Sequence, residues 1–159
     1  MKKLFLLPIM ATLLLLLTSC ANNSSKPSNT DLTAEKYTKI IKNLKKELSS
    51  INDVSWNFKK SNDVTNADIS KGTLIEVFPK NEKDSLSLMD TYISLGSKDK
   101  EAKSKITELQ KKVAKVARTL PNDNVEIALG FKSEQKSKGV IPVAKSIKSM
   151  DAIPINSSK

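Results

Sequence analysis

The chain of 159 residues contains no histidine and has a single cysteine, Cys20. Without histidine, the usual general base and the commonest zinc ligand are both missing. One cysteine forms no disulfide within the chain, so a folded domain must be held together by its core alone. The four glycines are isolated from one another, which excludes a glycine-rich phosphate-binding loop. We therefore expect a protein that is not an enzyme and that uses no metal or diffusible cofactor.

Arginine is almost as scarce, because Arg118 is the only one among 27 basic residues in a chain of formal net charge +10. Arginine supplies the planar fork that reads phosphates and base edges, so we expect no nucleic-acid partner. A lysine-rich surface suits anionic lipids and wall polymers, near which each lysine gains electrostatic energy. The lysine- and asparagine-rich composition suggests a Gram-positive bacterium with an AT-rich genome.

The longest apolar run is at the N-terminus. Lys2 and Lys3 precede an apolar segment over residues 4–17, which ends in five consecutive leucines. A positive start followed by a short apolar run is typical of a secretory signal sequence, and the run is too short for an ordinary membrane span. A branched apolar residue, two small residues and a cysteine then follow in order, as Leu17, Thr18, Ser19 and Cys20.

This ending resembles the lipobox of bacterial lipoproteins, and the resemblance covers residues 1–20 only. It implies that the Cys20 thiol receives a diacylglycerol carrying acyl chains such as palmitate. It also implies cleavage of the signal peptide, residues 1–19, and a mature protein anchored in the cell membrane at its extracytoplasmic face. Residues 21–31 have no large apolar side chain, so residues 20–31 are predicted to be a flexible tether that reaches roughly 20 Å.

Residues 32–150 have the patterns of a single α+β domain, and residues 151–159 are expected to be a frayed tail. Apolar residues recur at helical spacing over 33–51, where Thr33 is the expected N-cap, and over 98–120, where Ser97 is the expected N-cap. Alternating or continuous apolar residues predict strands at 54–58, 73–78, 125–131 and 140–147. Pro142 assigns the last strand to a sheet edge. A lone tryptophan in an alternating strand is usually core, so we expect Trp56 there rather than on a ligand-stacking platform.

Two stretches are less regular. Residues 60–72 are polar and rich in turn signals, which predicts a loop. Residues 85–95 fit a helix or irregular structure slightly better than a strand. Because strands and helices do not alternate one for one, a doubly wound parallel sheet is not expected. We predict a two-layer α+β fold, with an antiparallel sheet of about four strands and two amphipathic helices on one face.

Lysines gather on the polar sides of both long helices. They form either an ordinary solvated surface or a basic face toward anionic lipid or teichoic acid. The candidate contacts are Lys36, Lys39, Lys46, Lys111, Lys112, Lys115 and Arg118. The acidic pairs Glu82/Asp84 and Asp99/Glu101 lie among lysines and are better explained by solubility than by acid–base catalysis. Asn62, Asp63, Asn66 and Asp68 do not have the spacing of an EF-hand calcium loop.

These observations favour a membrane-anchored, non-catalytic binding module at the cell envelope. Its partner would be an envelope protein at the open sheet edge or an anionic wall polymer at the lysines. One alternative is an exclusion or immunity lipoprotein encoded by a mobile element or a phage. Another is a precursor whose cleaved signal fragment, which ends with Leu13 to Ser19, is a secreted peptide signal.

Overall fold

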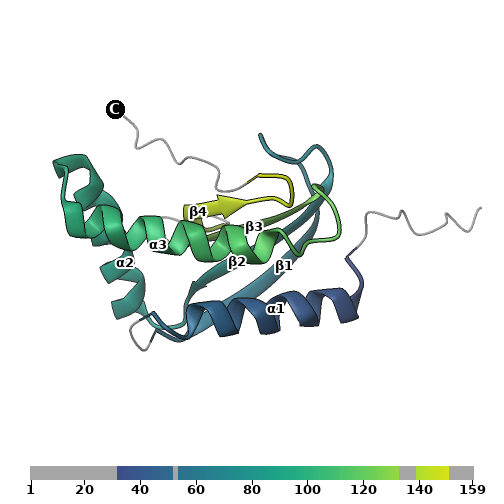
Figure 1. Ribbon diagram of the computed structural model, residues 1–159, viewed down its shortest axis with the longest axis horizontal. Helices are drawn as coiled ribbons and strands as arrows, with labels where there is room; N and C mark the ends of the chain where they lie inside the picture. The colour runs from purple at the N-terminus through teal and green to yellow at the C-terminus, as the bar shows by residue number, and fades with distance from the viewer. Residues whose placement is uncertain (1–31, 52–53, 133–138, 151–159) are drawn as a thin grey trace, which may run out of the picture.

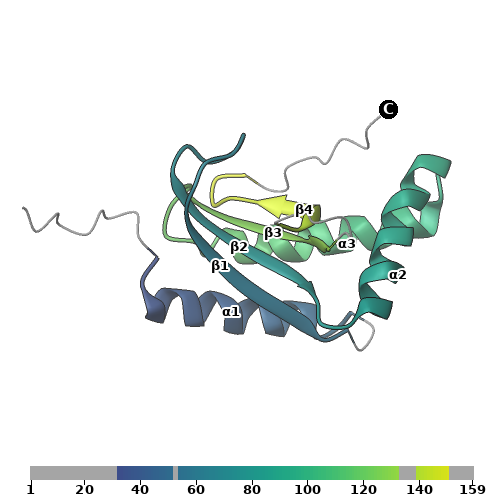
Figure 2. The same ribbon diagram turned by 180° about the vertical axis from the view of Figure 1, so that it is seen from behind.

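The computed structural model describes residues 32–51, 54–132 and 139–150. The elements in chain order are α1 (Ala34–Leu48), β1 (Trp56–Val64), β2 (Gly72–Pro79), α2 (Glu82–Ser94), the short 3-10 helix η1 (Leu95–Ser97), α3 (Lys100–Ala117), β3 (Val125–Phe131) and β4 (Ile141–Ser146). Helices α1 and α3 cover one face of a four-stranded sheet, and α2 stands at one end of it (Figures 1 and 2). The predicted α+β class is confirmed.

The sheet is mixed, with strand order β1-β2-β3-β4. The two outer pairs are antiparallel as predicted, but the central pair, β2 and β3, is parallel. The expectation of a fully antiparallel sheet was therefore wrong. The reason is the long helical connection over residues 80–124, which returns the chain to the end where β2 began. Pro142 lies in β4 at a sheet edge, as predicted.

The core lies between the sheet and the two covering helices. Branched side chains at alternate positions of the central strands point into it, including Ile75, Val77, Ile127 and Leu129. The helices contribute Ile40, Leu44, Leu48, Ile106, Leu109 and Val113 to the same cluster. Trp56 belongs to the cluster and is 9% exposed, so the predicted core position is confirmed.

Strand β1 is longer than predicted, because it continues to Val64 through part of the expected loop. Lys60 and Ser61 pair with β2 despite their polar side chains. An edge strand accommodates such residues, since backbone hydrogen bonds form regardless of the side chain and one side remains open to water. The pairing becomes irregular between Ser61 and Val64, where Asp63 has a φ of 54°.

The helix starts follow capping chemistry. The hydroxyl of Thr33 accepts a hydrogen bond from the backbone N–H of Lys36, as predicted. Ser97 does not cap α3 but ends η1, and the carboxylate of Asp99 instead accepts two backbone N–H groups of the first turn. The ambiguous stretch near residue 90 is helical, as α2. Within the described ranges, no helix combines the length and the hydropathy of a membrane-crossing segment.

The close approach of β3 and β4 at Gly130 is testable. A Cβ atom at this position would overlap the carbonyl oxygen of Ile141, whereas a Cβ at Gly96 in η1 would have nothing within 4 Å. We expect Gly130→Ala to lower the free energy of unfolding by about 2 kcal/mol, because backbone must move to admit the methyl group. Gly96→Ala should change it by less than about 0.5 kcal/mol. Urea unfolding followed by circular dichroism measures both, and equal effects would contradict the close approach.

Candidate functional site

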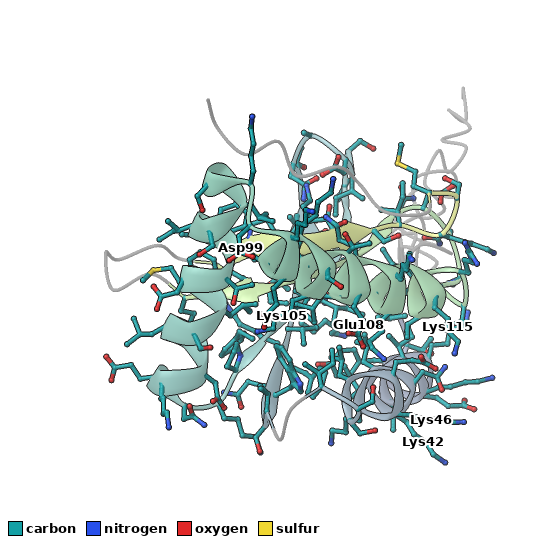
Figure 3. The ribbon with its side chains drawn as sticks, turned by 60° about the vertical axis from the view of Figure 1, so that its left-hand side comes forward. Lys42, Lys46, Asp99, Lys105, Glu108 and Lys115 are labelled. Carbon is teal, nitrogen blue, oxygen red and sulfur yellow. The ribbon has the colours of Figure 1, made fainter. Side chains whose placement is uncertain are left out.

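Helix α1 presents a line of lysines to solvent. Lys39, Lys42 and Lys46 are spaced i, i+3 and i+7, which places them on one side of the helix, and all three are exposed. Lys42 and Lys46 point away from α3 (Figure 3). None of the three forms an ion pair or a side-chain hydrogen bond with another described residue. We call these three residues the lysine strip; Lys36, also exposed, lies one turn closer to the start of α1.

Two candidate lysines of α3 are engaged with α1 instead. The Nζ of Lys115 lies 2.8 Å from Oε1 of Glu47, and the Nζ of Lys112 donates to Oγ of Ser50 at 2.8 Å. Lys112 also lies 3.5 Å from Oε1 of Glu108 on its own helix. The hydrogen bond from Lys115 lowers the pKa of Glu47 below its ordinary value. These two lysines therefore join the covering helices to each other.

The remaining candidates on α3 are Lys111 and Arg118, and both are exposed. Arg118 stands at the C-cap of the helix, where a positive charge is favourable to the helix dipole. The basic surface expected from both helices is thus most continuous on α1, along the lysine strip.

A groove runs between α2 and α3 toward the end of α1. Its deep end encloses about 220 Å³ and is lined by Trp56 together with apolar side chains that include Val54, Leu88 and Leu109. The indole Nε1–H of Trp56 is buried and has no hydrogen-bond acceptor among the described residues. The shallow end is an open hollow of about 740 Å³. Ser87, Thr91 and Lys105 line both ends, so the two hollows lie next to each other.

The groove is acidic although the chain is strongly basic. Six carboxylates line it, against two lysines, Lys83 and Lys105; the acidic residues are Glu82, Asp84, Asp90, Asp99, Glu101 and Glu108. The Nζ of Lys105 lies 2.8 Å from Oε1 of Glu101. Lys105 and Glu108 lie on the side of α3 toward the groove (Figure 3). The acidic pairs that the sequence assigned to solubility are thus gathered along one surface.

Two further carboxylates are buried on the opposite face of the sheet. Glu76 and Glu126 are 4% and 1% exposed, and both alternate with core residues of the central strands. The Nζ of Lys59 lies 3.3 Å from Oε2 of Glu76. The other carboxylate oxygen of Glu76, Oε1, accepts a hydrogen bond from the backbone N–H of Val140. The buried carboxylate of Glu76 is therefore both paired and hydrogen-bonded.

Glu126 is enclosed by the loop that precedes β2. The amide Nδ2 of Asn66 donates to its Oε2 at 3.0 Å, and the Nζ of Lys145 lies 3.8 Å from its Oε1. Lys145 also forms a close ion pair with Asp68. Burial raises the pKa of Glu126, and the hydrogen bond from Asn66 and the charge of Lys145 oppose that rise.

This cluster was not predicted from the sequence, where residues 73–78 and 125–131 were interpreted only as strands. The available signal was a glutamate at an alternating position inside an otherwise apolar strand. Asn66 and Asp68, considered above as calcium ligands, instead organise the loop over Glu126. Among the described residues, no group of three or more acidic, histidine or cysteine side chains could hold a metal ion.

Comparisons with protein-family models, with curated proteins and with solved structures found no match to this chain. The predicted lipidation site, Cys20, and the lipobox residues Leu17, Thr18 and Ser19 lie outside the described residues. A functional proposal therefore rests on the sequence of the N-terminus and on the geometry of the lysine strip and the acidic groove.

The burial of Glu126 predicts a pH dependence of stability. Because its pKa in the folded chain is raised above the ordinary 4.5, the native state binds this proton more tightly than the unfolded chain does. The contribution of Glu126 to the free energy of unfolding then falls as pH rises above that ordinary value. We expect Glu126→Gln to be more stable than the wild type at pH 7.5, with a difference that shrinks toward pH 4.5.

Urea unfolding at several pH values measures this difference, with Glu35→Gln, an exposed substitution on α1, as the control. The control should follow the wild type throughout. If Glu126→Gln is instead the less stable protein at pH 7.5, attraction to Lys145 outweighs the cost of burial.

Proposed function

We propose that the mature chain is a lipid-anchored, non-catalytic binding module at the extracytoplasmic face of the cell membrane. In this proposal Cys20 carries the anchor, and the lysine strip of α1 binds phosphate-bearing surfaces of the envelope, either lipid headgroups or an anionic wall polymer. The observation that carries the proposal is the lysine strip itself. Its three ammonium groups are exposed and form no ion pair with another described residue.

The energetics of α1 support an external partner. Like charges three and four residues apart on a helix repel each other and weaken it slightly. Lys115 of α3 is compensated by Glu47, whereas no lysine of the strip forms an ion pair with a described residue. An anionic surface would relieve the repulsion within the strip, and each bound lysine would gain about 1 kcal/mol near such a surface.

The position of α1 in the chain also supports this function. Eleven residues, 21–31, separate Cys20 from the buried Leu32 at the start of the domain. A flexible segment of that length reaches about 20 Å, which is a short distance from the membrane surface. The helix with the lysine strip is the first helix of the described residues, so it would lie close to the proposed anchor.

The anchor is tested in cells by replacing its cysteine. Cys20→Ala should abolish labelling of the protein by a palmitate analogue and move it out of the membrane fraction, because the thiol that accepts the lipid is gone. Ser24→Ala, a substitution in the proposed tether, should leave both unchanged. Retention of the label in Cys20→Ala would contradict lipidation at this residue.

The lysine strip is tested with the unlipidated mature chain. Replacement of Lys39, Lys42 and Lys46 by Gln should weaken binding to phosphatidylglycerol vesicles on the order of a hundredfold at low salt, since about 1 kcal/mol is lost per lysine. Binding of the wild type should fall steeply as salt is added. Co-sedimentation measures both, and a parallel arm with purified wall polymer distinguishes the two sources of phosphate.

The matched control removes the same charge elsewhere, by replacing the exposed residues Lys80, Lys98 and Lys103 with Gln. This variant should lose far less affinity than the strip variant. Equal losses in the two variants would show attraction to net charge without a defined site, and salt-insensitive binding would refute an electrostatic contact.

A further inference from the structure

The acidic groove points to a second ligand, of opposite charge to the first. We propose that the groove between α2 and α3 binds a cationic peptide segment of a partner protein, with one apolar side chain of that segment seated in the deep end beside Trp56. This inference goes beyond the proposed function and rests on a different surface, so either can fail without the other.

The size of the deep end limits what it can hold. Its volume of about 220 Å³ equals that of roughly seven waters and is smaller than a typical cofactor or drug-sized site. Apolar side chains from α1's C-terminal connection, α2 and α3 converge on it, among them Ile51, Leu88 and Leu109. A single large apolar side chain fits within this volume and suits the lining, and such an anchor in a pocket is how many interfaces concentrate their affinity.

Trp56 lines the deep end, so its indole reports on an occupant of that hollow. Its Nε1–H lacks an acceptor among the described residues, but the nitrogen is itself closed to solvent, so an occupant reaches it only if the indole moves.

The charge of the groove selects a cationic segment. Its carboxylates exceed its lysines by four, in a chain whose own net charge is +10. Several of these carboxylates already serve the fold, since Asp99 caps α3 and Glu101 pairs with Lys105. Glu82 and Asp90 on α2 have no side-chain partner among the described residues. They are positioned to receive basic residues that flank the anchor.

The test uses three capped pentapeptides and the fluorescence of Trp56, which is the only tryptophan in the chain. The first peptide has the sequence Lys-Lys-Leu-Lys-Lys, the second replaces its leucine by serine, and the third replaces its lysines by glutamate. The first should shift the Trp56 emission saturably and bind at least tenfold more tightly than the other two. Equal binding of the leucine and serine peptides would overturn the anchor, and equal binding of the lysine and glutamate peptides would overturn the charge complementarity.

Two variants localise the site without disturbing the core. Ser87→Phe, at an exposed position that lines both ends, should fill the deep end and abolish binding of the leucine peptide. Glu82→Gln combined with Asp90→Asn should weaken it about tenfold, whereas Glu35→Gln on α1 should not change it. Undiminished binding by the Ser87→Phe variant would overturn the proposed site.

The same variants also test a second copy of the chain as the occupant. Sedimentation of the wild type over a range of concentrations should show a monomer. Self-association that Ser87→Phe abolishes would overturn the proposal of a partner peptide, because another copy would then occupy the groove.

Discussion

Parallel pairing of β2 with β3 is the constraint on which the rest of the structure depends. Two parallel neighbouring strands cannot be joined by a tight turn, so a crossover connection must return the chain to the end of the sheet where the first strand began. Residues 80–124 form this connection and contain α2, η1 and α3. Helix α3 lies on the sheet and completes the core, whereas α2 stands at the end of the sheet with no fully buried residue (Figure 1). The groove lies where α2 stands beside α3, with Leu88, Met89 and Tyr92 of α2 only partly buried against the core.

The sequence predicts much of this fold where one pattern dominates a segment. The periodicity of α1 and α3 reflects a single buried face, which local sequence records directly. The alternation of β3 identified a strand correctly, although all of Val125–Phe131 is buried and its second face holds Glu126. The direction of β3 was predicted wrongly because it depends on the whole connection, and that connection becomes a crossover only once α2 is known to be a helix. The extension of β1 through Lys60 was missed because backbone pairing at a sheet edge places little demand on side chains.

The functional surfaces differ in how much of them the sequence contains. Lys39 and Lys46 of the lysine strip were among the candidates from the sequence, whereas Lys42 was not named, although the same helical spacing includes it. The engagement of Lys112 and Lys115 with α1 was not visible, because it depends on how two distant helices pack. The groove is assembled from segments that extend from Ser50 to Leu109, and no local pattern records such a convergence. Trp56 shows what a local pattern leaves out. Its core position was predicted correctly, but the sequence did not indicate that its side chain also lines a hollow.

The buried glutamates behind the sheet have a consequence for how the strands align during folding. A slip of one residue between β2 and β3 would exchange the faces of a strand, which would bring Glu126 into the apolar core and Ile127 to the position facing Lys145. Such an alignment would bury an unpaired charge, at a cost of several kcal/mol. Apolar residues in place of Glu76 and Glu126 would make the correct and shifted pairings more nearly equal in energy. The ionic cluster therefore selects one alignment of the two most buried strands, even though the burial of Glu126 is itself unfavourable.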